Sequence, residues 1–268
     1  MSALLIVCAV SSCSKDDDAP ANEGSTLVKY KTTFRDTLVF HYIYERDANN
    51  KIISARDSSK VGILSTIKLE YGNNGKVAKV LFLENGVNPI SSFELEYNSD
   101  GRISKRKIRG GTLPVKEHYN VYVYDATGHL AIDSQFTTGN NVTFKLTMVS
   151  KFKYTGDNIT EAENYTLLNG NGTLGLDTKL KYEYDNAINP FKGLENEYYI
   201  NEAGSAIYTI PLKSANNVVK MYKADGNGGW DLLATTTYQY NSNNYAWKAD
   251  TQNHMATQQN YSVEYFFQ

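Results

Sequence analysis

Residues 122–130 read Tyr-Val-Tyr-Asp-Ala-Thr-Gly-His-Leu. In an extended chain, Tyr122 and Tyr124 point to one face and Val123 points to the other. The Asp-Ala-Thr-Gly segment that follows carries the residues of a tight turn, including a glycine for backbone with positive φ. An apolar residue, Leu130, then begins the return. The stretch therefore predicts a β-hairpin.

The same pattern recurs along the chain. Its anchoring tyrosines lie at positions 44, 71, 97, 124, 154, 184, 240 and 265, and the steps between them are 27, 26, 27, 30, 30, 56 and 25 residues. The long step equals two steps of 28, which predicts a degenerate copy near Val218–Tyr222. Two strands per copy predict a meander of about 14 to 17 strands. Since no capped apolar stripe of helical period appears, we expect an all-β fold.

Apolar and charged residues alternate in these segments, which predicts strands with one buried and one solvated face. In residues 93–97 the aromatic and leucine side chains share one face and the two glutamates share the other. In residues 144–154 the predicted inner face consists of Phe144, Leu146, Met148, Phe152 and Tyr154. Twist makes a wide sheet curl, but a closed barrel of about sixteen strands would enclose a lumen too wide for side chains to fill.

We therefore expect one β-repeat domain over residues 27–268. It would be an antiparallel meander of β-hairpins, strongly curled into an open sheet or an incomplete barrel, and the sequence pattern does not decide whether the sheet closes. Alternating strands also mark outer-membrane barrels. That class is disfavoured because the apolar stretches are shorter than a lipid-facing band.

The first residues predict export. Residues 3–10 form an apolar run that is too short to span a bilayer as a helix, and Ser11, Ser12 and Cys13 follow it. This end resembles the lipobox of bacterial lipoproteins, which implies a signal peptide over residues 1–12 and a lipid on Cys13. Residues 1–12 lack the basic residue of a signal peptide, which leaves the true start codon open. Cys8 would be removed with the signal, so the domain itself has no cysteine.

A polar, acidic tether over residues 13–26 follows. Ser14, Lys15, Asp16 and Asp17 resemble the surface-export signal of lipoproteins in Bacteroidetes-type bacteria, which implies an outer-membrane lipoprotein facing the cell surface. A plain acidic spacer on a protein that faces the periplasm is the alternative.

The hairpins resemble the YD repeat of Rhs-type proteins, with residues 122–130 as the best match. They resemble more strongly the YD-like repeats of uncharacterised Bacteroidetes lipoproteins, in which a Tyr-x-Tyr-Asp-Asn strand precedes Asn-Pro-Phe. Here Tyr182–Asn186 leads to Asn189–Phe191. The resemblance covers residues 40–268 and implies no established activity.

Candidate residues for chemistry are few. The histidines at positions 41, 118, 129 and 254 lack zinc-ligand spacing, and we predict no metal, cofactor or catalytic residue. The loop from Asp225 to Trp230 predicts a hairpin turn rather than a calcium site. The carboxylate pairs Glu94 with Glu96 and Glu161 with Glu163 fit a solvated strand face. Trp230 and Trp247 are candidate ligand contacts, because aromatic rings stack on sugars and peptides. Thr37, in Asp-Thr-Leu, resembles an O-glycosylation site.

The net charge is −2 and no basic stripe stands out, which argues against nucleic-acid binding. The leading hypothesis is a non-enzymatic, surface-anchored module that binds a glycan, a peptide or a partner protein, with the membrane reached only through the lipid. The alternative is a structural or assembly accessory of an outer-membrane complex. An enzyme is the least favoured class.

Overall fold

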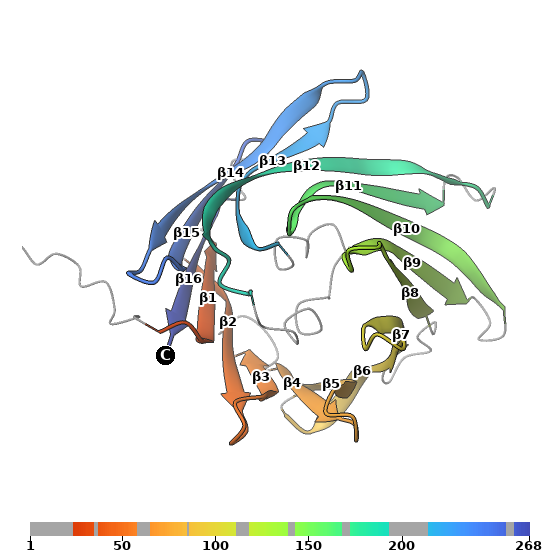
Figure 1. Ribbon diagram of the computed structural model, residues 1–268, viewed down its shortest axis with the longest axis vertical. Coiled ribbons are helices and arrows are strands. Elements are labelled where there is room, and N and C mark those ends of the chain that lie inside the picture. Colours follow the sequence, from red (N-terminus) through yellow and green to blue (C-terminus); the bar gives the residue numbers. More distant parts are fainter. Residues whose placement is uncertain are drawn as a thin grey trace, which may run out of the picture.

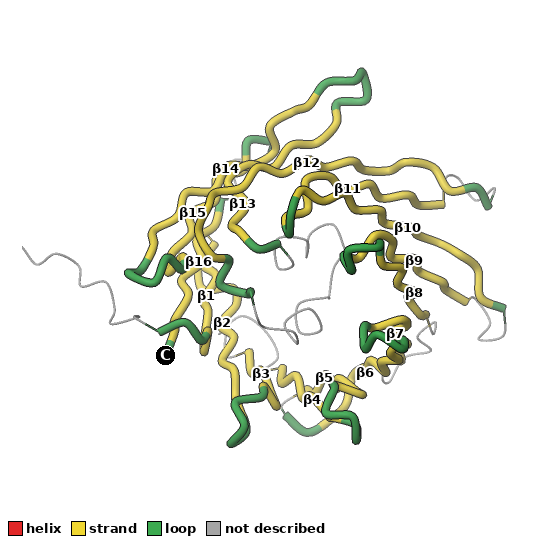
Figure 2. The backbone as a smooth tube through the Cα atoms, in the orientation of Figure 1, coloured by secondary structure: helices red, strands yellow, loops and turns green. Residues whose placement is uncertain are grey.

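The computed structural model describes residues 24–34, 37–57, 65–84, 86–110, 118–138, 143–167, 172–192, 214–255 and 260–268. Sixteen strands and no helix lie in these ranges, and the strands form one closed antiparallel barrel (Figures 1 and 2). The strands are β1 (Leu27–Phe34), β2 (Thr37–Arg46), β3 (Ile52–Asp57), β4 (Ser65–Tyr71), β5 (Val77–Glu84), β6 (Asn88–Tyr97), β7 (Ile103–Gly110), β8 (His118–Tyr124), β9 (Leu130–Thr138), β10 (Phe144–Thr155), β11 (Asn158–Leu167), β12 (Leu174–Ile188), β13 (Asn216–Ala224), β14 (Trp230–Tyr240), β15 (Ala246–Asn253) and β16 (Tyr261–Phe267). Among these residues no helix could cross a membrane.

Each strand pairs with its neighbours in sequence, and β16 pairs with β1 from Leu27↔Phe267 to Phe34↔Tyr261. The predicted all-β meander of hairpins is therefore confirmed, and its curl proceeds to full closure. The predicted signal peptide, the predicted lipidation site Cys13 and the predicted export signal at Ser14–Asp17 lie outside the described residues.

The repeat comprises eight hairpin units, and the register corrects two features of the predicted alignment. The 56-residue step is a single unit, because Val218 in β13 pairs with Tyr184 in the preceding strand β12. No degenerate copy exists near Val218–Tyr222. Residues 189–215 are instead an insertion between the two strands of one unit. The eighth unit joins the two ends of the chain, since its first strand is β16 and its return strand is β1.

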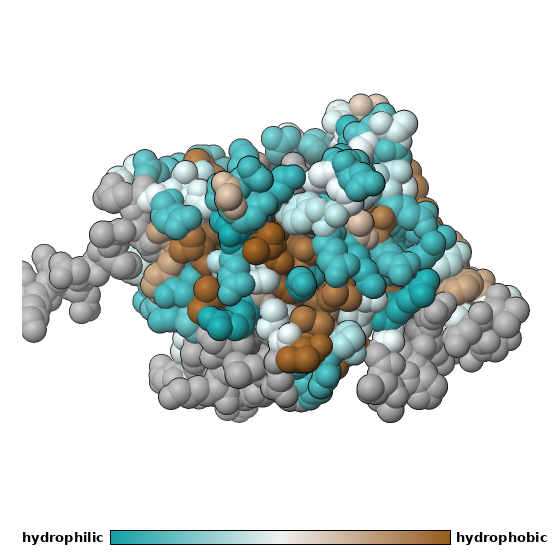
Figure 3. Space-filling view, turned by 90° about the horizontal axis from the view of Figure 1, so that it is seen from below, coloured by the Kyte–Doolittle hydropathy of each residue, from teal (hydrophilic) through white to brown (hydrophobic). Residues whose placement is uncertain are grey.

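The inner and outer faces of the wall differ as the alternation predicted. Inward-facing side chains form two apolar clusters, one centred on β1–β6 with β15 and β16, the other on β8–β13. The outer face carries opposite charges directly across from one another in neighbouring strands, which stabilises a sheet surface in water. These pairs include Glu70↔Lys79, Lys79↔Glu94, Glu96↔Lys105, Glu163↔Lys179, Glu183↔Lys220 and Lys248↔Glu264. Figure 3, seen from the side of β3–β6, shows hydrophilic side chains interspersed with a central group of hydrophobic ones.

Part of the lumen is filled by the chain itself. The segment that follows β12 turns into the ring of strands (Figure 1). There Phe191 packs edge-on against two inward tyrosines on the far side of the seam, Tyr30 at 5.5 Å and Tyr265 at 5.6 Å between ring centroids. The Asn-Pro-Phe motif thus supplies an internal packing residue. Large aromatic residues and this segment thus occupy part of the space inside a wide barrel, which the wall side chains alone would leave open.

Polar bonds hold the base of the insertion. The Asp185 carboxylate accepts hydrogen bonds from the Asn217 side chain at 3.0 Å and from the Tyr240 hydroxyl at 2.6 Å. The buried Asn189 amide donates to the Ser214 carbonyl at 3.0 Å, where the chain returns to the sheet. These bonds fix both ends of the insertion although its strands are far apart in sequence.

A ladder of tyrosine hydroxyls links consecutive units. Five of the anchoring tyrosines donate to a carbonyl at the start of the preceding unit's return strand, in its first or second residue. The bonds are Tyr71 to Ile52 (2.6 Å), Tyr97 to Val77 (2.6 Å), Tyr124 to Ile103 (2.8 Å), Tyr154 to Leu130 (3.2 Å) and Tyr184 to Ile159 (2.5 Å). In the next unit Tyr238 makes the bond to Val218 at 2.9 Å, because Tyr240 binds Asp185. The ladder fixes the spacing of the units.

The first and last units depart from the predicted anchors Tyr44 and Tyr265. Arg46 pairs with Ile52 as Tyr71 pairs with Val77, and its guanidinium donates to the Leu27 carbonyl at 3.2 Å. Phe267 takes the same place in β16, opposite Leu27. Tyr44 and Tyr265 lie two residues earlier, in the apolar core. The ladder thus changes chemistry at the seam where the barrel closes.

The turns form a second ladder at the same end of the barrel. In four consecutive turns, the basic residue that ends the turn covers the next unit's tyrosine ring: Lys51 over Tyr71, Lys76 over Tyr97, Arg102 over Tyr124, and His129 stacked on Tyr154 with ring centroids 4.4 Å apart. The lysines also donate to the next turn's glycine carbonyl, as Lys51 does to Gly75 at 3.2 Å. Glycine is required at position 128, since its φ is +96° and a Cβ would collide with the Arg102 guanidinium.

One predicted face is wrong. In β10 the register shifts between Leu146 and Met148, which pair with the adjacent residues Phe136 and Gln135. The extra residue, Thr147, is a β-bulge, and a bulge reverses the side-chain alternation. Met148 and Phe152 face inward as expected. Phe144 and Leu146, expected in the core, face the outside of the barrel instead.

The tyrosine ladder predicts the cost of losing one hydroxyl. Tyr97→Phe leaves the Val77 carbonyl without that donor, so we expect a loss of about 1 to 3 kcal/mol in the free energy of unfolding. Tyr222→Phe is the control, because its hydroxyl binds Glu183 on the exposed outer wall, where changes stay within about 0.5 kcal/mol. Urea denaturation checks both variants. Equal losses would contradict the ladder's role.

Burial of the ladder also predicts alkaline unfolding. Burial raises the pKa of Tyr124 and of Tyr184 to about 12. Unfolded tyrosine ionises near pH 10, so this stabilisation is complete below about pH 10 and is lost as the pH rises toward the folded pKa. The urea midpoint should therefore fall steeply between about pH 10 and about pH 12, and the midpoint of Tyr124→Phe should fall less steeply. A midpoint that stays constant over this range would contradict the prediction.

Candidate functional site

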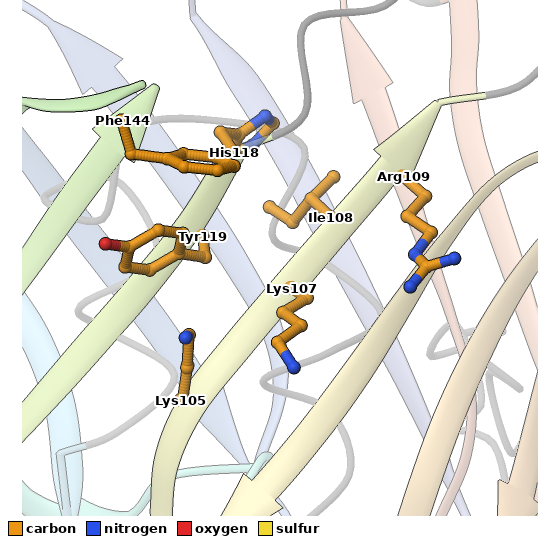
Figure 4. A pocket seen from close by; sticks show the side chains of 7 residues that line it. All are labelled: Lys105, Lys107, Ile108, Arg109, His118, Tyr119 and Phe144. Atoms are coloured by element: carbon orange, nitrogen blue, oxygen red, sulfur yellow. The ribbon is translucent and has the colours of Figure 1, made fainter. Parts of the chain in front are cut away.

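A groove with a volume of about 440 Å³ lies on the outer wall (Figure 4). Its floor and one side come from β7, which contributes Lys105, Lys107 and Arg109. The other side is aromatic, with Tyr119 from β8 and Phe144 from β10. Ile108 and His118 complete the lining at the end of the barrel. The volume falls in the range of small-ligand sites.

Strand alternation and the bulge together create this groove. Lys105, Lys107 and Arg109 occupy alternate positions, so they share the outer face of β7. Lys107 pairs with Tyr119, which therefore also faces outward. Phe144 joins them only because the bulge at Thr147 turns the start of β10 outward.

The aromatic side is ordered by ring packing. Tyr119 stacks on Phe136 with centroids 4.8 Å apart and an angle of 13° between the rings, and Phe144 lies 5.0 Å from Tyr119 at 54°. The Lys105 ammonium lies 4.2 Å from the Tyr119 centroid, a cation–π contact. Three aromatic rings from three neighbouring strands thus form an outward row beside the cations.

The groove has an excess of positive charge. Lys107 lies 2.5 Å from Glu96, and Arg109 lies 3.5 Å from Glu94. The hydrogen bond between Lys107 and Glu96 lowers the pKa of the carboxyl and raises the pKa of the amine. Lys105 has no ion pair of its own within the described ranges. Three permanent cations therefore meet two carboxylates here.

The predicted carboxylate pairs are bound to lysines. Glu161 lies 3.0 Å from Lys153 and 3.4 Å from Lys179, and Glu163 lies 3.1 Å from Lys179. Hydrogen bonds from Lys153 and from Tyr165 are the main causes that lower the pKa of Glu161 and of Glu163, respectively. A glycosidase acid needs a raised pKa. These groups therefore favour the predicted solvated face over acid catalysis.

The structure does not bring the two tryptophans together. Trp230 begins β14 on the outer wall, with the amines of Lys179 and Lys181 at 5.7 and 5.3 Å from its ring. Trp247, in β15, is half-buried and packs against the first core cluster. They sit at opposite ends of the β14–β15 hairpin, about 30 Å apart at the usual rise per residue. Neither lies in the groove.

The other predicted positions are easily placed. Thr37 is exposed at the first residue of β2. The Asp225 loop joins β13 to β14, and the Asp225 carboxylate accepts hydrogen bonds from the backbone of Asn227 at 2.8 Å and of Gly229 at 2.9 Å, as a turn residue does. Within the described ranges, no group of three or more His, Cys, Asp or Glu is placed to hold a metal ion.

A polar row crosses the inside of the wall beside the groove. Arg106 donates to the Asn120 side chain at 3.1 Å, and Asn120 donates to Asp133 at 2.7 Å. Their exposed fractions are only 5%, 1% and 2%. Ser150 and Asn164 continue the row with a hydrogen bond of 3.0 Å. We interpret the row as structural, because its charged ends are linked through Asn120.

Sequence reasoning missed the groove for two reasons. The Lys-x-Lys-x-Arg pattern at residues 105–109 was a readable signal, since alternate residues of a strand share a face. It is a short basic stripe, although none was expected. The aromatic side had no such signal, because regular alternation assigns Phe144 to the core.

Two solved structures share the fold. A porin-like protein from Bacteroides uniformis ATCC 8492 has a TM-score of 0.56 at 10% identity, covering 90% of this chain and 96% of its own. A porin-like protein from Bacteroides vulgatus ATCC 8482 has a TM-score of 0.56 at 9% identity, covering 91% and 98%. The TcdB2-TccC3 toxin without its hypervariable region matches at a TM-score of only 0.31. No known family and no curated protein matches the sequence. At these identities the likeness concerns the fold alone.

The buried row predicts a strong effect on stability. Asp133→Ala leaves the Arg106 charge buried without its counter-ion in the row, so the free energy of unfolding should fall by about 3 to 5 kcal/mol. Arg106→Met combined with Asp133→Leu should cost less than the sum of the single changes, because no isolated charge remains. A double-mutant cycle by chemical denaturation checks this. If the losses in the free energy of unfolding are additive, the two charged ends of the row are not coupled and the prediction is wrong.

Proposed function

We propose that this protein is a non-enzymatic binding protein, tethered beside the outer membrane by a lipid on Cys13, with the outer-wall groove as its ligand site. The observation that carries the proposal is the outward aromatic pair formed by Tyr119 and Phe144, 5.0 Å apart. Catalysis is not part of the proposal, because the outer-wall carboxylates discussed above are paired with lysines and the pKa values of these carboxyl groups are lowered.

The outward aromatic residues need an explanation because the fold has an easier arrangement. Regular alternation in β10 would place Phe144 and Leu146 inside, where burying a large apolar side chain contributes about 1.5 to 3 kcal/mol. The bulge at Thr147 forgoes that contribution and keeps the side chains at the surface. Apolar groups beside convergent polar groups in a concave surface are typical of binding sites.

The charged wall supports a tether rather than a membrane-spanning barrel. Bacterial membrane barrels place an apolar band outward, and a lysine at mid-bilayer costs about 2 to 4 kcal/mol. Here lysines and glutamates face outward at mid-strand from β4 to β16. The porin-like neighbours therefore supply a fold, and the membrane is reached in this proposal through Cys13. The residues Ser14–Asp17 would direct export to the cell surface, and the exposed Thr37 would accept a glycan.

The position of the tether suits a ligand that arrives from outside. The described chain begins at the seam, where Thr26 and Gln268 exchange backbone hydrogen bonds at 3.3 and 3.0 Å. This is the end of the barrel that carries the tyrosine ladder. The aromatic side of the groove lies toward the other end, where β8 and β10 begin. In this proposal the lipid is attached at the end of the barrel opposite the aromatic side of the groove, which leaves that side free for a ligand.

Ligand capture tests the proposal. Three proteins are screened on glycan and envelope-protein panels. They are the tether-free domain, its double variant Tyr119→Ser with Phe144→Ser, and a control variant. The control, Tyr222→Ser, removes an outer-wall tyrosine that also lies beside a lysine, Lys181 at 4.5 Å. We expect a ligand whose affinity falls by about tenfold or more in the groove variant alone, since aromatic contacts at binding sites are worth about 1 to 2 kcal/mol. An affinity that is unchanged in the groove variant, or that falls equally in the groove variant and the control, would contradict the groove as the ligand site.

A further inference from the structure

We infer that the groove binds an acidic saccharide, one that carries carboxylate or sulfate groups along its chain. This inference rests on the proposed function and names the ligand class of the same site. It follows from three properties of the groove: its row of cations, its aromatic side, and the absence of an open strand edge on this part of the wall.

The cations form a regular row. Lys105, Lys107 and Arg109 alternate along β7, so their Cα atoms are about 6.7 Å apart from one to the next. A flexible polymer with repeated negative groups can meet such a row in several registers. The carboxylates of Glu94 and Glu96 neutralise only part of it, through exposed pairs that a ligand anion can displace at small cost.

The aromatic side suits a sugar ring. A pyranose has an apolar C–H face and a polar edge, so it can pack on an aromatic ring while its charged substituent reaches a cation. Tyr119 is covered by Phe136 and by Lys105. Phe144 is tilted 54° from Tyr119 at the end of the row, and it faces the cations across the groove (Figure 4). It is therefore the platform we assign to the sugar ring.

An acidic peptide fits less well. Extended peptides commonly bind by adding a strand to an open sheet edge, where main-chain hydrogen bonds supply affinity. Here β7 pairs with β6 and β8, β8 pairs with β7 and β9, and β10 pairs with β9 and β11. The barrel is closed, so this wall offers only side chains to a ligand.

Titration calorimetry of the tether-free domain tests the inference with defined probes. They are an oligogalacturonide, a heparin-derived oligosaccharide of the same length, the carboxyl-reduced oligogalacturonide as neutral counterpart, and poly-glutamate. At least one acidic saccharide should bind, at least tenfold more tightly than the neutral probe and than poly-glutamate. Its affinity should fall with added salt, because exposed charges are screened.

Matched variants locate the binding. The double variant Lys105→Gln with Lys107→Gln should bind the acidic saccharide roughly tenfold more weakly, since two exposed cation contacts are lost. Lys220→Gln is the control, because Lys220 forms the same kind of cross-strand pair, 3.1 Å from Glu183, on a distant part of the wall. It should leave the affinity unchanged. Circular dichroism of all variants verifies that the barrel is intact.

Other outcomes overturn the inference and separate it from the proposed function. Equal binding of neutral and acidic saccharides at the groove would refute the charge requirement and leave a binding protein. Tighter binding of poly-glutamate would make the ligand a peptide. A loss of affinity in Lys220→Gln equal to that in the groove variant would show non-specific attraction to charge. If no acidic saccharide binds but the panels identify a different ligand of the groove, only the inference about acidic saccharides fails. If the panels identify no ligand either, both this inference and the proposed binding function fail.

Discussion

The hydrogen bond from a tyrosine hydroxyl to the carbonyl of the preceding unit is the interaction on which the rest of the barrel depends. Each hairpin alone would expose two edges, and an isolated hairpin is marginally stable in water. The bond joins a half-buried hydroxyl to a main-chain carbonyl beside the bulge where a unit turns, so it favours one register between consecutive units. Repeating it around the wall makes closure the arrangement in which no strand edge remains.

Closure then assigns a special role to the two ends of the chain. The last strand and the first form one unit, so the barrel is completed only when the whole chain has folded. At this seam the ladder uses Arg46 and Phe267 in place of tyrosine, and Phe191 packs from inside onto Tyr30 and Tyr265. Apolar packing from within thus stabilises the unit whose strands lie furthest apart in sequence, where the loss of chain entropy on closure is greatest.

Much of this could be predicted from the sequence, because period and alternation are local properties. Tyr97 with its Asn-Ser-Asp-Gly turn specifies a hairpin without reference to the rest of the chain. Three features depended on contacts that no local pattern reveals. The bulge at Thr147 is visible only in the pairing of β10 with β9, the shift from Tyr44 to Arg46 only in the pairing of β2 with β3, and the insertion after β12 only when β13 is seen to pair with it. The groove depends on the first of these, so half of the site was predictable and half was not.

A closed meander leaves its outer face free for function. The side chains of the inner face form the tyrosine ladder, the two apolar clusters and the polar row. A substitution on this face therefore affects stability first. On the outer face, charges opposite one another across strands contribute little individually, so they can be exchanged for other side chains without loss of the fold. A single bulge suffices to add aromatic residues to such a surface, because it reverses the facing of one strand segment while the hydrogen bonds on either side persist. A binding site on the outer wall is the arrangement that this division between the two faces favours.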